Sequence, residues 1–379
     1  MDNFGGFCPV EIRYMTKKDM AKYLCGFEIS KKVALVAEEI VIKSAGLDQM
    51  IWDMDGKYEF KWVKGVVPNP TQETVMSALE FIGERPELII AIGGGSTMDL
   101  AKGISAFFRY YEKGDLTIES MTQVIKDKSY RGSKDVVPIY AVPTTSGTGS
   151  EFTKWATIWD LNKTAKFSID DNELYAKEAL LVPEMLHTVP KRMMLSTGLD
   201  AMCQAMESFW AKATNPLVQD IATMAMIRIK QNLKNALKDE VDEKAMEGMS
   251  MGSSMAGIAF SNTRTTACHS ISYPMTMMFG VPHGFACILT LNEVAKRNKL
   301  VVPKINDMLE EVFGDSENGL ANWLKDVSEG IQELTLSGFG IDEKEIPRIA
   351  AAAFTAGRMD NNPVDFSQKD VEEILYAIK

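Results

Sequence analysis

Four polar side chains in the second half of the chain have the types and the spacing to bind a divalent metal ion. The sequence contains only three histidines, His187, His269 and His283, and the last two are 14 residues apart. Asp200 and Gln204 are four residues apart, so on a helix they would share one face. A carboxylate, an amide oxygen and two imidazoles could together surround one cation. Alternatively, each histidine is a hydrogen-bonded core residue and Asp200 begins a helix.

A glycine-rich turn in the first half has the composition of a phosphate-binding loop. The run Ile92–Asp99 follows an apolar strand and opens a helix that continues through Lys102. Glycine permits close backbone approach, and the free N–H groups at the start of a helix attract an anion, so the turn suits a pyrophosphate. Its candidate cofactor-binding residues are Gly93, Gly94, Gly95 and Ser96. Because the spacing is neither GxGxxG nor a Walker motif, a purely steric need for glycine stays open.

A second run, Pro143–Glu151, also follows an apolar strand and is rich in hydroxyl groups and glycines. Two such loops at the carboxyl ends of parallel strands can converge on one crevice, where open sheets bind nucleotides. The candidate cofactor-binding residues here are Thr144, Thr145, Ser146 and Gly149. Glu38 follows an earlier strand, where a carboxylate can accept hydrogen bonds from a ribose diol and repel a 2′-phosphate. This position favours NAD(H) over NADP(H), with a solvated surface carboxylate as the alternative.

The hydrophobic pattern changes near the middle of the chain. In the first half, short apolar runs end in turn residues and alternate with helical periodicity. These runs are Val33–Val36, Glu87–Ile92 and Val136–Val142. Strands that alternate with helices predict a parallel sheet covered on both faces. From about Glu184, apolar residues recur every three or four positions, which predicts helices. We therefore expect an α/β dinucleotide-binding domain over 1–183 and a helical metal-binding and catalytic domain over 184–379.

Composition and charge restrict the class of protein. A chain of 379 residues, 46% of them hydrophobic, can build two or three packed domains, which argues against disorder. The 41 Lys and Arg against 52 Asp and Glu give a net charge of -11, which opposes binding to nucleic acid or to an anionic membrane surface. Five cysteines without a CxxC pair, and no signal-like or membrane-spanning apolar segment, predict a cytoplasmic protein.

Five ordered motifs resemble those of the iron-containing, or group III metal-dependent, alcohol dehydrogenase family over nearly the whole chain. They are Gly65–Thr71, Gly93–Ser96 with Asp99 and Lys102, Pro143–Glu151, Gly198–Ala201 and Val281–Gly284. The resemblance implies the dehydroquinate synthase-like fold, with a Rossmann-like N-terminal domain and an all-helical C-terminal domain. It also implies NAD(P) across the two glycine-rich loops, a catalytic metal ion, and a homodimer. Further cofactor-binding positions that it implies are Asn69, Asp99 and Lys166.

The resemblance places Asp200, His269 and His283 on metal ligands of the family, but two positions depart from its pattern. The family's other ligand is a histidine, and here that position is Gln204. A further active-site histidine is here Tyr273. An amide oxygen binds first-row metals less strongly than imidazole does, so the identity of the metal (Fe, Zn or Mn) stays open. Replacement of Gln204 by water, or loss of the metal altogether, also stays open.

Within the family, the segments around Gln204, Arg264 and Tyr273 look most like the branch that reduces phosphonoacetaldehyde or sulfoacetaldehyde. Arg264 lies five residues before His269, and its guanidinium could hold a sulfonate or phosphonate through paired hydrogen bonds. A salt bridge to one of the many acidic residues is the alternative. In the implied reaction, a metal polarises the aldehyde oxygen and the nicotinamide transfers hydride. Water, the cofactor ribose or the Tyr273 phenol then supplies the proton.

The expected activity is therefore NADH-dependent and metal-dependent reduction of a small anionic two-carbon aldehyde. The expected substrates are sulfoacetaldehyde, giving isethionate, or phosphonoacetaldehyde, giving 2-hydroxyethylphosphonate. Both carry tetrahedral anions of similar size, so one arginine does not distinguish them. The alternatives are a broad short-chain primary alcohol dehydrogenase of the same family, a non-redox NAD-using cyclase, and a metal-free binding protein on the same fold.

Overall fold

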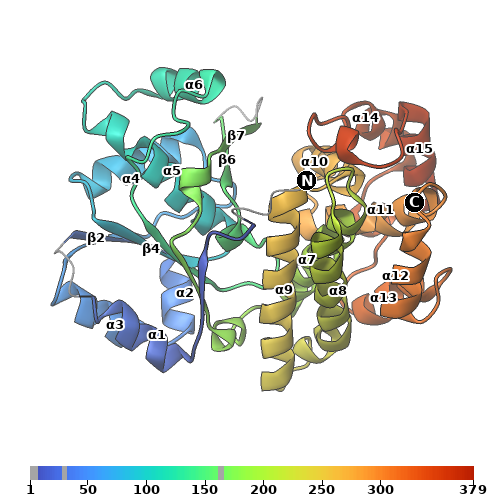
Figure 1. Ribbon diagram of the computed structural model, residues 1–379, viewed down its shortest axis with the longest axis horizontal. Helices are drawn as coiled ribbons and strands as arrows, with labels where there is room; N and C mark the ends of the chain where they lie inside the picture. The colour runs from blue at the N-terminus through green and yellow to red at the C-terminus, as the bar shows by residue number, and fades with distance from the viewer. Residues whose placement is uncertain (1–6, 28–31, 161–165) are drawn as a thin grey trace. The chain divides into compact units, whose positions relative to one another are not determined.

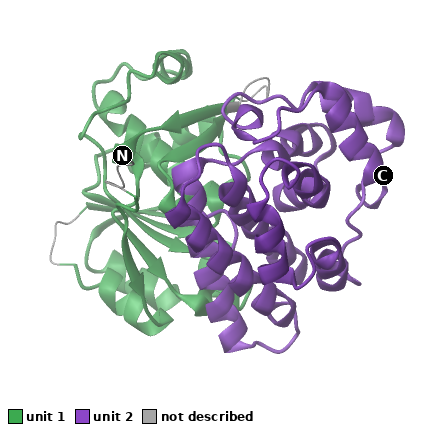
Figure 2. Cartoon of the chain, turned by 45° about the vertical axis from the view of Figure 1, so that its right-hand side comes forward, with its two compact units in different colours: residues 1–145, 150–188 green, residues 146–149, 189–379 purple. Residues whose placement is uncertain are grey.

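The computed structural model describes residues 7–27, 32–160 and 166–379, and the chain folds into two compact units (Figures 1 and 2). Unit 1 consists of Met1–Thr145 and Ser150–Thr188, and unit 2 of Ser146–Gly149 and Val189–Lys379. The backbone thus enters unit 2 twice, first with a short piece of the second glycine-rich run. The main passage, after Thr188, lies five residues beyond the expected domain boundary at 183.

Unit 1 is built on a six-stranded sheet in which every neighbouring pair is parallel. Its strands, in chain order, are β1 (Glu11–Tyr14), β2 (Lys32–Val36), β3 (Glu59–Val63), β4 (Leu88–Gly93), β5 (Ile139–Pro143) and β8 (Glu178–Leu181). In the sheet they lie in the order β1-β8-β5-β4-β2-β3. All six residues of β4 are buried, as expected for a central strand covered on both faces. The predicted parallel α/β architecture is confirmed.

Helices cover both faces of this sheet (Figure 1). They are α1 (Lys17–Leu24), α2 (Glu39–Ser44), α3 (Asp48–Asp55), α4 (Gln72–Ile82), α5 (Gly95–Tyr111) and α6 (Ile118–Asp127). On one face, Met20 of α1 and Met50 of α3 pack against alternate residues of the strands, such as Leu35 and Ile90. A two-stranded antiparallel hairpin, β6 (Trp155–Trp159) with β7 (Lys166–Asp170), completes the described part of the unit.

The strand order creates a switch point at the carboxyl ends of β2 and β4. From β2 the chain moves outward to β3, and it then returns to place β4 on the other side of β2. The connections that follow β2 and β4 therefore run in opposite directions across the sheet. In open α/β sheets this arrangement leaves a crevice in which ligands bind.

Among the residues that the structure describes, unit 2 consists of helices joined by turns and loops, without a strand. Its helices are α7 (Lys191–Trp210), α8 (Pro216–Ala236), α9 (Glu243–Thr263), α10 (Ala267–Phe279), α11 (His283–Asn298), α12 (Lys304–Phe313), α13 (Gly319–Ser328), α14 (Ile346–Ala351) and α15 (Gln368–Ala377). Helix α7 is the central one, since nearly all its residues from Met194 to Trp210 are buried. The predicted helical second half is confirmed. None of the helices in the described ranges has the length and apolarity that a membrane crossing requires.

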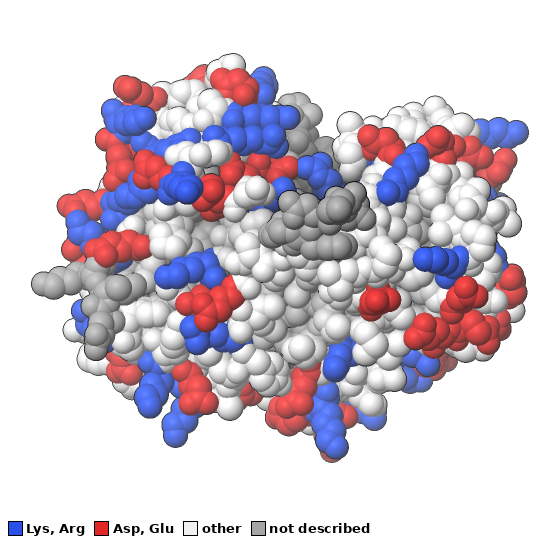
Figure 3. Space-filling model, in the orientation of Figure 1, with Lys and Arg blue, Asp and Glu red and all other residues white. Residues whose placement is uncertain are grey.

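On the face of the molecule drawn in Figure 3, lysines and arginines are interspersed with acidic side chains over unit 1. Salt bridges of unit 1 include Lys43 with Glu39 and Arg85 with Asp135. Surface pairs of this kind contribute little to stability.

Candidate functional site

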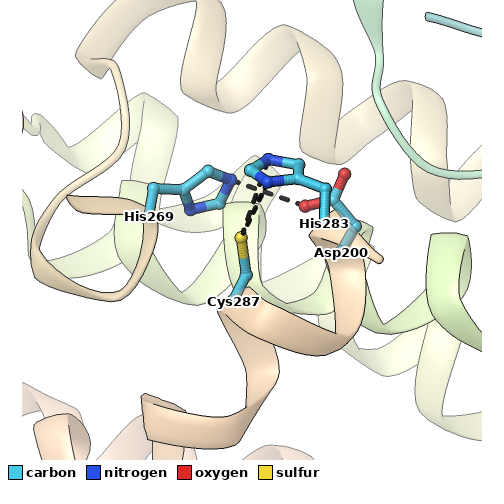
Figure 4. Close-up of side chains that lie close together, drawn as sticks. All are labelled: Asp200, His269, His283 and Cys287. Carbon is cyan, nitrogen blue, oxygen red and sulfur yellow. Dashed lines mark hydrogen bonds and ion pairs between the residues drawn. The ribbon is translucent and has the colours of Figure 1, made fainter. Parts of the chain in front are cut away.

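Four side chains that could ligate a metal converge inside unit 2 (Figure 4). Asp200 comes from α7, His269 from α10, and both His283 and Cys287 from α11. One ligand atom of each lies within 4.8 Å of those of the other three. The imidazole centroids of His269 and His283 are 5.3 Å apart. The structure thus brings together the aspartate and the two histidines that were selected by residue type and spacing, and it adds a cysteine to them.

A glycine allows α11 to begin directly against α7. A Cβ atom at Gly284 would lie 1.9 Å from the carbonyl oxygen of Ser196 and 3.0 Å from the Cβ atom of Asp200. No real Cβ atom approaches a backbone oxygen so closely, so the contact requires glycine at this position. Because His283 is the first residue of α11 and precedes this glycine, its imidazole is held next to Asp200.

The cluster contains buried acceptor atoms that have no hydrogen-bond partner within the described ranges. Asp200 is 3% exposed, and its Oδ1 atom has none, although Nε2 of His269 lies 3.4 Å away. The Oε1 atom of Gln204 has none either, while its Nε2 donates to Oδ2 of Asp200 at 3.1 Å. Buried polar atoms are seldom left unpaired, because each costs free energy. A carboxylate oxygen, imidazole nitrogens and a nearby amide oxygen therefore fit a divalent cation.

Glu207 fixes the orientation of His269, and it was not predicted from the sequence. Its side chain is fully buried, and Oε2 accepts a hydrogen bond from Nδ1 of His269. Its Oε1 atom accepts from the backbone N–H groups of Cys268 (2.8 Å) and Thr266 (3.1 Å). A proton held on Nδ1 by this carboxylate leaves Nε2, which lies 3.4 Å from Asp200, as the nitrogen that could ligate a metal, as in the outer shell of many metal sites. The i, i+4, i+7 spacing of Asp200, Gln204 and Glu207 was the signal that could have revealed it.

Cys287 was also missed. Its Sγ atom lies 3.8 Å from Nδ1 and 3.7 Å from Nε2 of His283, which is four residues earlier on α11. Burial opposes ionisation of the thiol, but hydrogen bonding to Cys203 and the imidazoles of His269 and His283 outweigh it and lower the pKa of Cys287 well below its ordinary value. The i, i+4 relation to a predicted ligand was the signal available in the sequence. The number and spacing of the five cysteines had indicated only a cytoplasmic location, not a ligand.

Tyr273 lies beside the cluster. It follows His269 by one helical turn on α10, and its ring is parallel to that of His283, with an interplanar angle of 3° and centroids 6.1 Å apart. At this separation the two rings are parallel and offset, with the phenol ring beside the imidazole. The role predicted for it, proton donation, stays a prediction.

Arg264 occupies the turn between α9 and α10, with an exposed side chain and a backbone φ of 63°. This left-handed conformation is unusual for a residue other than glycine. The amide of Asn361 holds the turn by donating to the carbonyl oxygens of Thr263 (2.9 Å) and Thr265 (3.2 Å). The guanidinium passes close to the backbone of Gly357, where a Cβ atom would lie 3.1 Å from Nη1 of Arg264. The turn therefore presents a guanidinium just ahead of the helix that carries His269 and Tyr273.

In unit 1, the two glycine-rich runs meet at the carboxyl ends of β4 and β5. The two strands are parallel neighbours, and the N–H group of Thr144 donates to the carbonyl oxygen of Gly93 at 3.1 Å. A Cβ atom at Gly94 would lie 3.3 Å from Oγ1 of Thr145. The backbone N–H of Asn69, a residue with φ of 57°, donates to Oγ of Ser96 at 3.2 Å. Six of the predicted cofactor-binding residues thus lie close together in these three pairs, around the start of α5 at Gly95.

Glu38 and Asp99 differ in their surroundings. Glu38 is half-buried and lies just past the carboxyl end of β2, the parallel neighbour of β4. This places it at the switch point of the sheet, as expected for a residue that contacts a ribose. The carboxylate of Asp99 instead accepts hydrogen bonds from the hydroxyl of Ser150 (3.3 Å) and the backbone N–H of Thr157 (3.0 Å). It ties α5 to the segment after the second glycine-rich run.

The remaining predicted cofactor-binding residues lie elsewhere. Ser146 belongs to unit 2, where its hydroxyl contacts Sδ of Met194 at 3.4 Å. Gly149, also in unit 2, has a φ of 55°, and a Cβ atom there would lie 2.5 Å from Cα of Gly257. The backbone of Lys166 begins β7, and its side chain lies outside the described part of the structure. Their roles toward a cofactor, like those of the other loop residues, stay predictions.

Lys102, one of the motif residues, fixes the end of the second run. Its buried ammonium donates to the carbonyl oxygens of Ser150 (2.7 Å) and Trp155 (3.0 Å) and to the hydroxyl of Thr153 (3.0 Å). Burial lowers the pKa of Lys102 to about 8, against the opposing influence of Asp99 and Glu151. Lys102 therefore stabilises the segment that follows the second glycine-rich run, because one ammonium group donates to several buried acceptors.

Replacing Gly93 with alanine is expected to disturb the start of α5. The new Cβ atom would lie 2.1 Å from Oγ1 of Thr97, a side chain that is itself buried and cannot move away freely. Overpacking of this kind costs about 1–3 kcal/mol. Thermal unfolding should register the lost stability, and titration with NADH should show weaker binding. Gly56→Ala is the control, since its Cβ atom would meet nothing closer than 3.6 Å, and equal behaviour of the two variants would contradict the prediction.

Two family models together match most of the chain. The model described as "Iron-containing alcohol dehydrogenase" matches residues 15–183, and that described as "Fe-containing alcohol dehydrogenase family, C-terminal" matches residues 194–378. The chain belongs to the iron-containing alcohol dehydrogenase family. The predicted family and fold are thereby confirmed.

Individual relatives span nearly the full length of the chain. It is similar to a 1,3-propanediol dehydrogenase of Citrobacter freundii, with 29% identity over 88% of this chain and 84% of that protein. An NADPH-dependent butanol dehydrogenase of Clostridium saccharobutylicum is 28% identical over 84% of each chain. The crystal structure of a sulfoacetaldehyde reductase of Bifidobacterium kashiwanohense in complex with NAD+ is 27% identical, covers 98% of this chain and 97% of its own, and has a TM-score of 0.84.

Membership of the family settles the class of reaction. The protein is an oxidoreductase that interconverts alcohols and aldehydes with a nicotinamide cofactor, and a divalent metal ion is the family's other cofactor. The predicted enzyme class and cofactors are confirmed, and the non-redox cyclase is not supported. The relatives named above differ in substrate, so the substrate does not follow from membership alone.

Proposed function

We propose that the protein is an NADH-dependent, metal-dependent reductase of a small anionic two-carbon aldehyde, either sulfoacetaldehyde or phosphonoacetaldehyde. The observation that carries this proposal is the placement of Arg264. Its left-handed backbone is held by two hydrogen bonds from Asn361, directly before the helix that bears His269 and Tyr273. A residue kept in a costly conformation points to a function that needs its side chain there. The similarity to a sulfoacetaldehyde reductase supports the same substrate class.

The chain's own residues divide the work of this reaction. Asp200, His269 and His283 would hold the metal beside Gln204, and the loops after β4 and β5 would hold the pyrophosphate of the cofactor. When bound, the metal ion supplies Lewis-acid polarisation and NADH supplies the hydride. Arg264 binds the sulfonate or phosphonate through paired hydrogen bonds and so orients the aldehyde. Tyr273 donates the proton that the former carbonyl oxygen needs to become a hydroxyl group.

Glu38 supports NADH rather than NADPH as the reductant. It lies at the carboxyl end of β2, next to the strand that leads into the first glycine-rich run. A carboxylate there accepts hydrogen bonds from the two ribose hydroxyl groups, and its charge repels a 2′-phosphate.

Replacement of Arg264 by alanine tests the substrate class. The wild-type protein should oxidise NADH faster with sulfoacetaldehyde or phosphonoacetaldehyde than with acetaldehyde. Loss of a charge-assisted hydrogen-bond pair, at about 1.5–3 kcal/mol, should lower kcat/KM for the anionic aldehydes about 10- to 100-fold. The value for acetaldehyde should stay within about twofold, since that substrate offers the guanidinium no partner. Arg264→Lys should recover only part of the loss, because an ammonium cannot form the paired contact.

Arg348→Ala is the matched control, since Arg348 is an exposed arginine of unit 2 that pairs with Glu345. It should leave all three kcat/KM values unchanged. A wild-type preference for acetaldehyde would contradict the proposal and favour the broad short-chain alcohol dehydrogenase. Equal losses on all three aldehydes in Arg264→Ala would also contradict it.

Two further expectations concern the assembly and the location of the protein, and the first of them rests on the family resemblance. A homodimer is proposed for the assembly, which light scattering of the purified protein tests. A cytoplasmic location is proposed from the composition, and fractionation of cells that express the protein tests it.

A further inference from the structure

We propose that the thiolate of Cys287 is a metal ligand, which completes a site of one aspartate, two histidines and one cysteine. This proposal rests on the metal dependence of the proposed function. It changes the expected donor set, in which Gln204 stood as the fourth ligand. It also changes which metal the site prefers.

The geometry of α11 supports the assignment of Cys287. Cys287 follows His283 by four residues, so the two side chains leave the same face of the helix. The sulfur lies within 3.8 Å of both ring nitrogens of His283, and it belongs to the same group of atoms within 4.8 Å as Asp200 and His269 (Figure 4). These four side chains come from three helices and point toward one another, so one ion could reach all four with small rotations.

Gln204 is engaged differently. Its amide nitrogen donates to Oδ2 of Asp200 at 3.1 Å, which leaves Oδ1 of that carboxylate without a hydrogen-bond partner in the described part of the chain. An amide that donates to a ligating carboxylate fixes its orientation, as outer-shell partners commonly do. The Oε1 atom of Gln204 is also unpartnered there, which makes the amide oxygen the competing fourth ligand. The experiment below separates the two.

A neighbouring cysteine provides a natural comparison. Cys203 is buried, but its Sγ atom approaches His269 at Nδ1, at a distance of 4.0 Å, and lies 3.8 Å from Oε2 of Glu207. The Nδ1 atom already bonds to Glu207, so this side of the imidazole is occupied. Cys203 therefore has the same chemistry and burial as Cys287, without access to the Nε2 side of His269.

The donor set has a consequence for metal identity. Thiolate and imidazole ligands suit Zn²⁺, whereas carboxylate and amide oxygens suit harder ions such as Mn²⁺. With Asp200 and Cys287 both anionic and both histidines neutral, the complex of a divalent ion with its four ligands would have no net charge. With Gln204 in place of Cys287, one positive charge would remain. The sulfur ligand therefore favours zinc over manganese at this site.

Cobalt substitution of the full-length protein tests the assignment, because thiolate ligation gives Co²⁺ an intense near-ultraviolet charge-transfer band that oxygen and nitrogen ligands do not give. The wild-type protein, Cys203→Ser and Gln204→Ala should show this band. Cys287→Ser should lose it, and its zinc affinity should fall by more than the about 10- to 100-fold that removal of an outer-shell partner costs. X-ray absorption of the zinc-loaded wild-type protein should show one sulfur at about 2.3 Å, which requires no variant to fold.

The outcomes separate this proposal from the proposed function. A cobalt-loaded wild-type protein without the band, with no sulfur seen at zinc, would overturn the role of Cys287 and leave a metal-dependent reductase intact. Retention of the band in Cys287→Ser, or its loss in Cys203→Ser, would likewise overturn it. A wild-type protein that reduces the aldehydes but binds no metal would instead overturn the metal dependence on which both proposals rest.

Discussion

Asp200→Ala is expected to lose the bound metal ion and to reduce aldehydes more than about 10³-fold more slowly than the wild-type protein, because Lewis-acid stabilisation is worth several kcal/mol. Asp200 is the only carboxylate in the group of four candidate ligands. Its Oδ1 atom is buried and has no hydrogen-bond partner in the described residues, so this oxygen is available to bind a metal ion. Removing it also releases the amide of Gln204, which donates to Oδ2.

Metal content and steady-state NADH oxidation should be measured on the same preparations. Asp200→Asn keeps the size of the side chain and removes its charge, so it should remain folded while binding metal weakly. Asp220→Ala removes an exposed carboxylate from α8 and should match the wild-type protein in both measurements. A full complement of metal and near-normal activity in Asp200→Ala would show that the cluster in unit 2 is not the metal site.

The fold class could be predicted from the hydrophobic pattern of the sequence, because that pattern shows which residues are buried. Leu88–Gly93 is apolar without alternation, and β4 is a central strand that is buried on both faces. The long segments after Glu184 repeat every three or four residues, and they form the helices of unit 2. The sheet order was not available from the pattern, since periodicity says which residues are buried and not which strands pair. The pairing of β1 with β8 joins segments about 165 residues apart.

The candidate metal site was predicted in part. His269 and His283 could be predicted as ligands because the chain has only three histidines, which leaves few possible pairs of imidazole ligands. Glu207 and Cys287 escaped because neither residue type is rare enough to attract notice alone. Both lie one helical turn from a predicted ligand, and only the packing of α11 against both α7 and α10 turns that spacing into contact. The close contact at Gly284 shows how strongly the crossing depends on packing that no local pattern reveals.

The predicted cofactor residues illustrate a second limit. Gly93, Asn69 and Thr144 meet at one edge of the sheet, as expected for loops that follow neighbouring parallel strands. Asp99 lies in the same motif, yet its carboxylate binds Ser150 and the backbone of β6. A residue can belong to a motif because it binds the cofactor or because it stabilises the loop, and the motif does not say which. Only the hydrogen-bond partners distinguish the two.

Glu207→Ala is expected to weaken both the fold and metal binding. The Glu207 carboxylate accepts hydrogen bonds from the backbone N–H groups of Thr266 and Cys268, at the start of α10. The side chain of Thr266 does not cap that helix, so the Glu207 carboxylate from α7 caps it instead. Its negative charge also interacts favourably with the positive end of the helix dipole. Leaving these buried donors unpaired should cost about 3 kcal/mol or more, measured by chemical unfolding of the metal-free protein.

Glu207→Gln separates the two roles of this side chain. Its amide oxygen can still accept from the backbone of Cys268, so much of the stability of the metal-free protein should remain. Its NH2 group, however, would face Nδ1 of His269, which now donates to the Glu207 carboxylate. That exchange favours a proton on Nε2, the atom that lies 3.4 Å from Oδ1 of Asp200, and so removes the lone pair that would bind the metal. Metal affinity should fall about 10- to 100-fold. If Glu207→Gln bound metal as tightly as the wild-type protein while Glu207→Ala unfolded readily, Glu207 would act only as a helix cap.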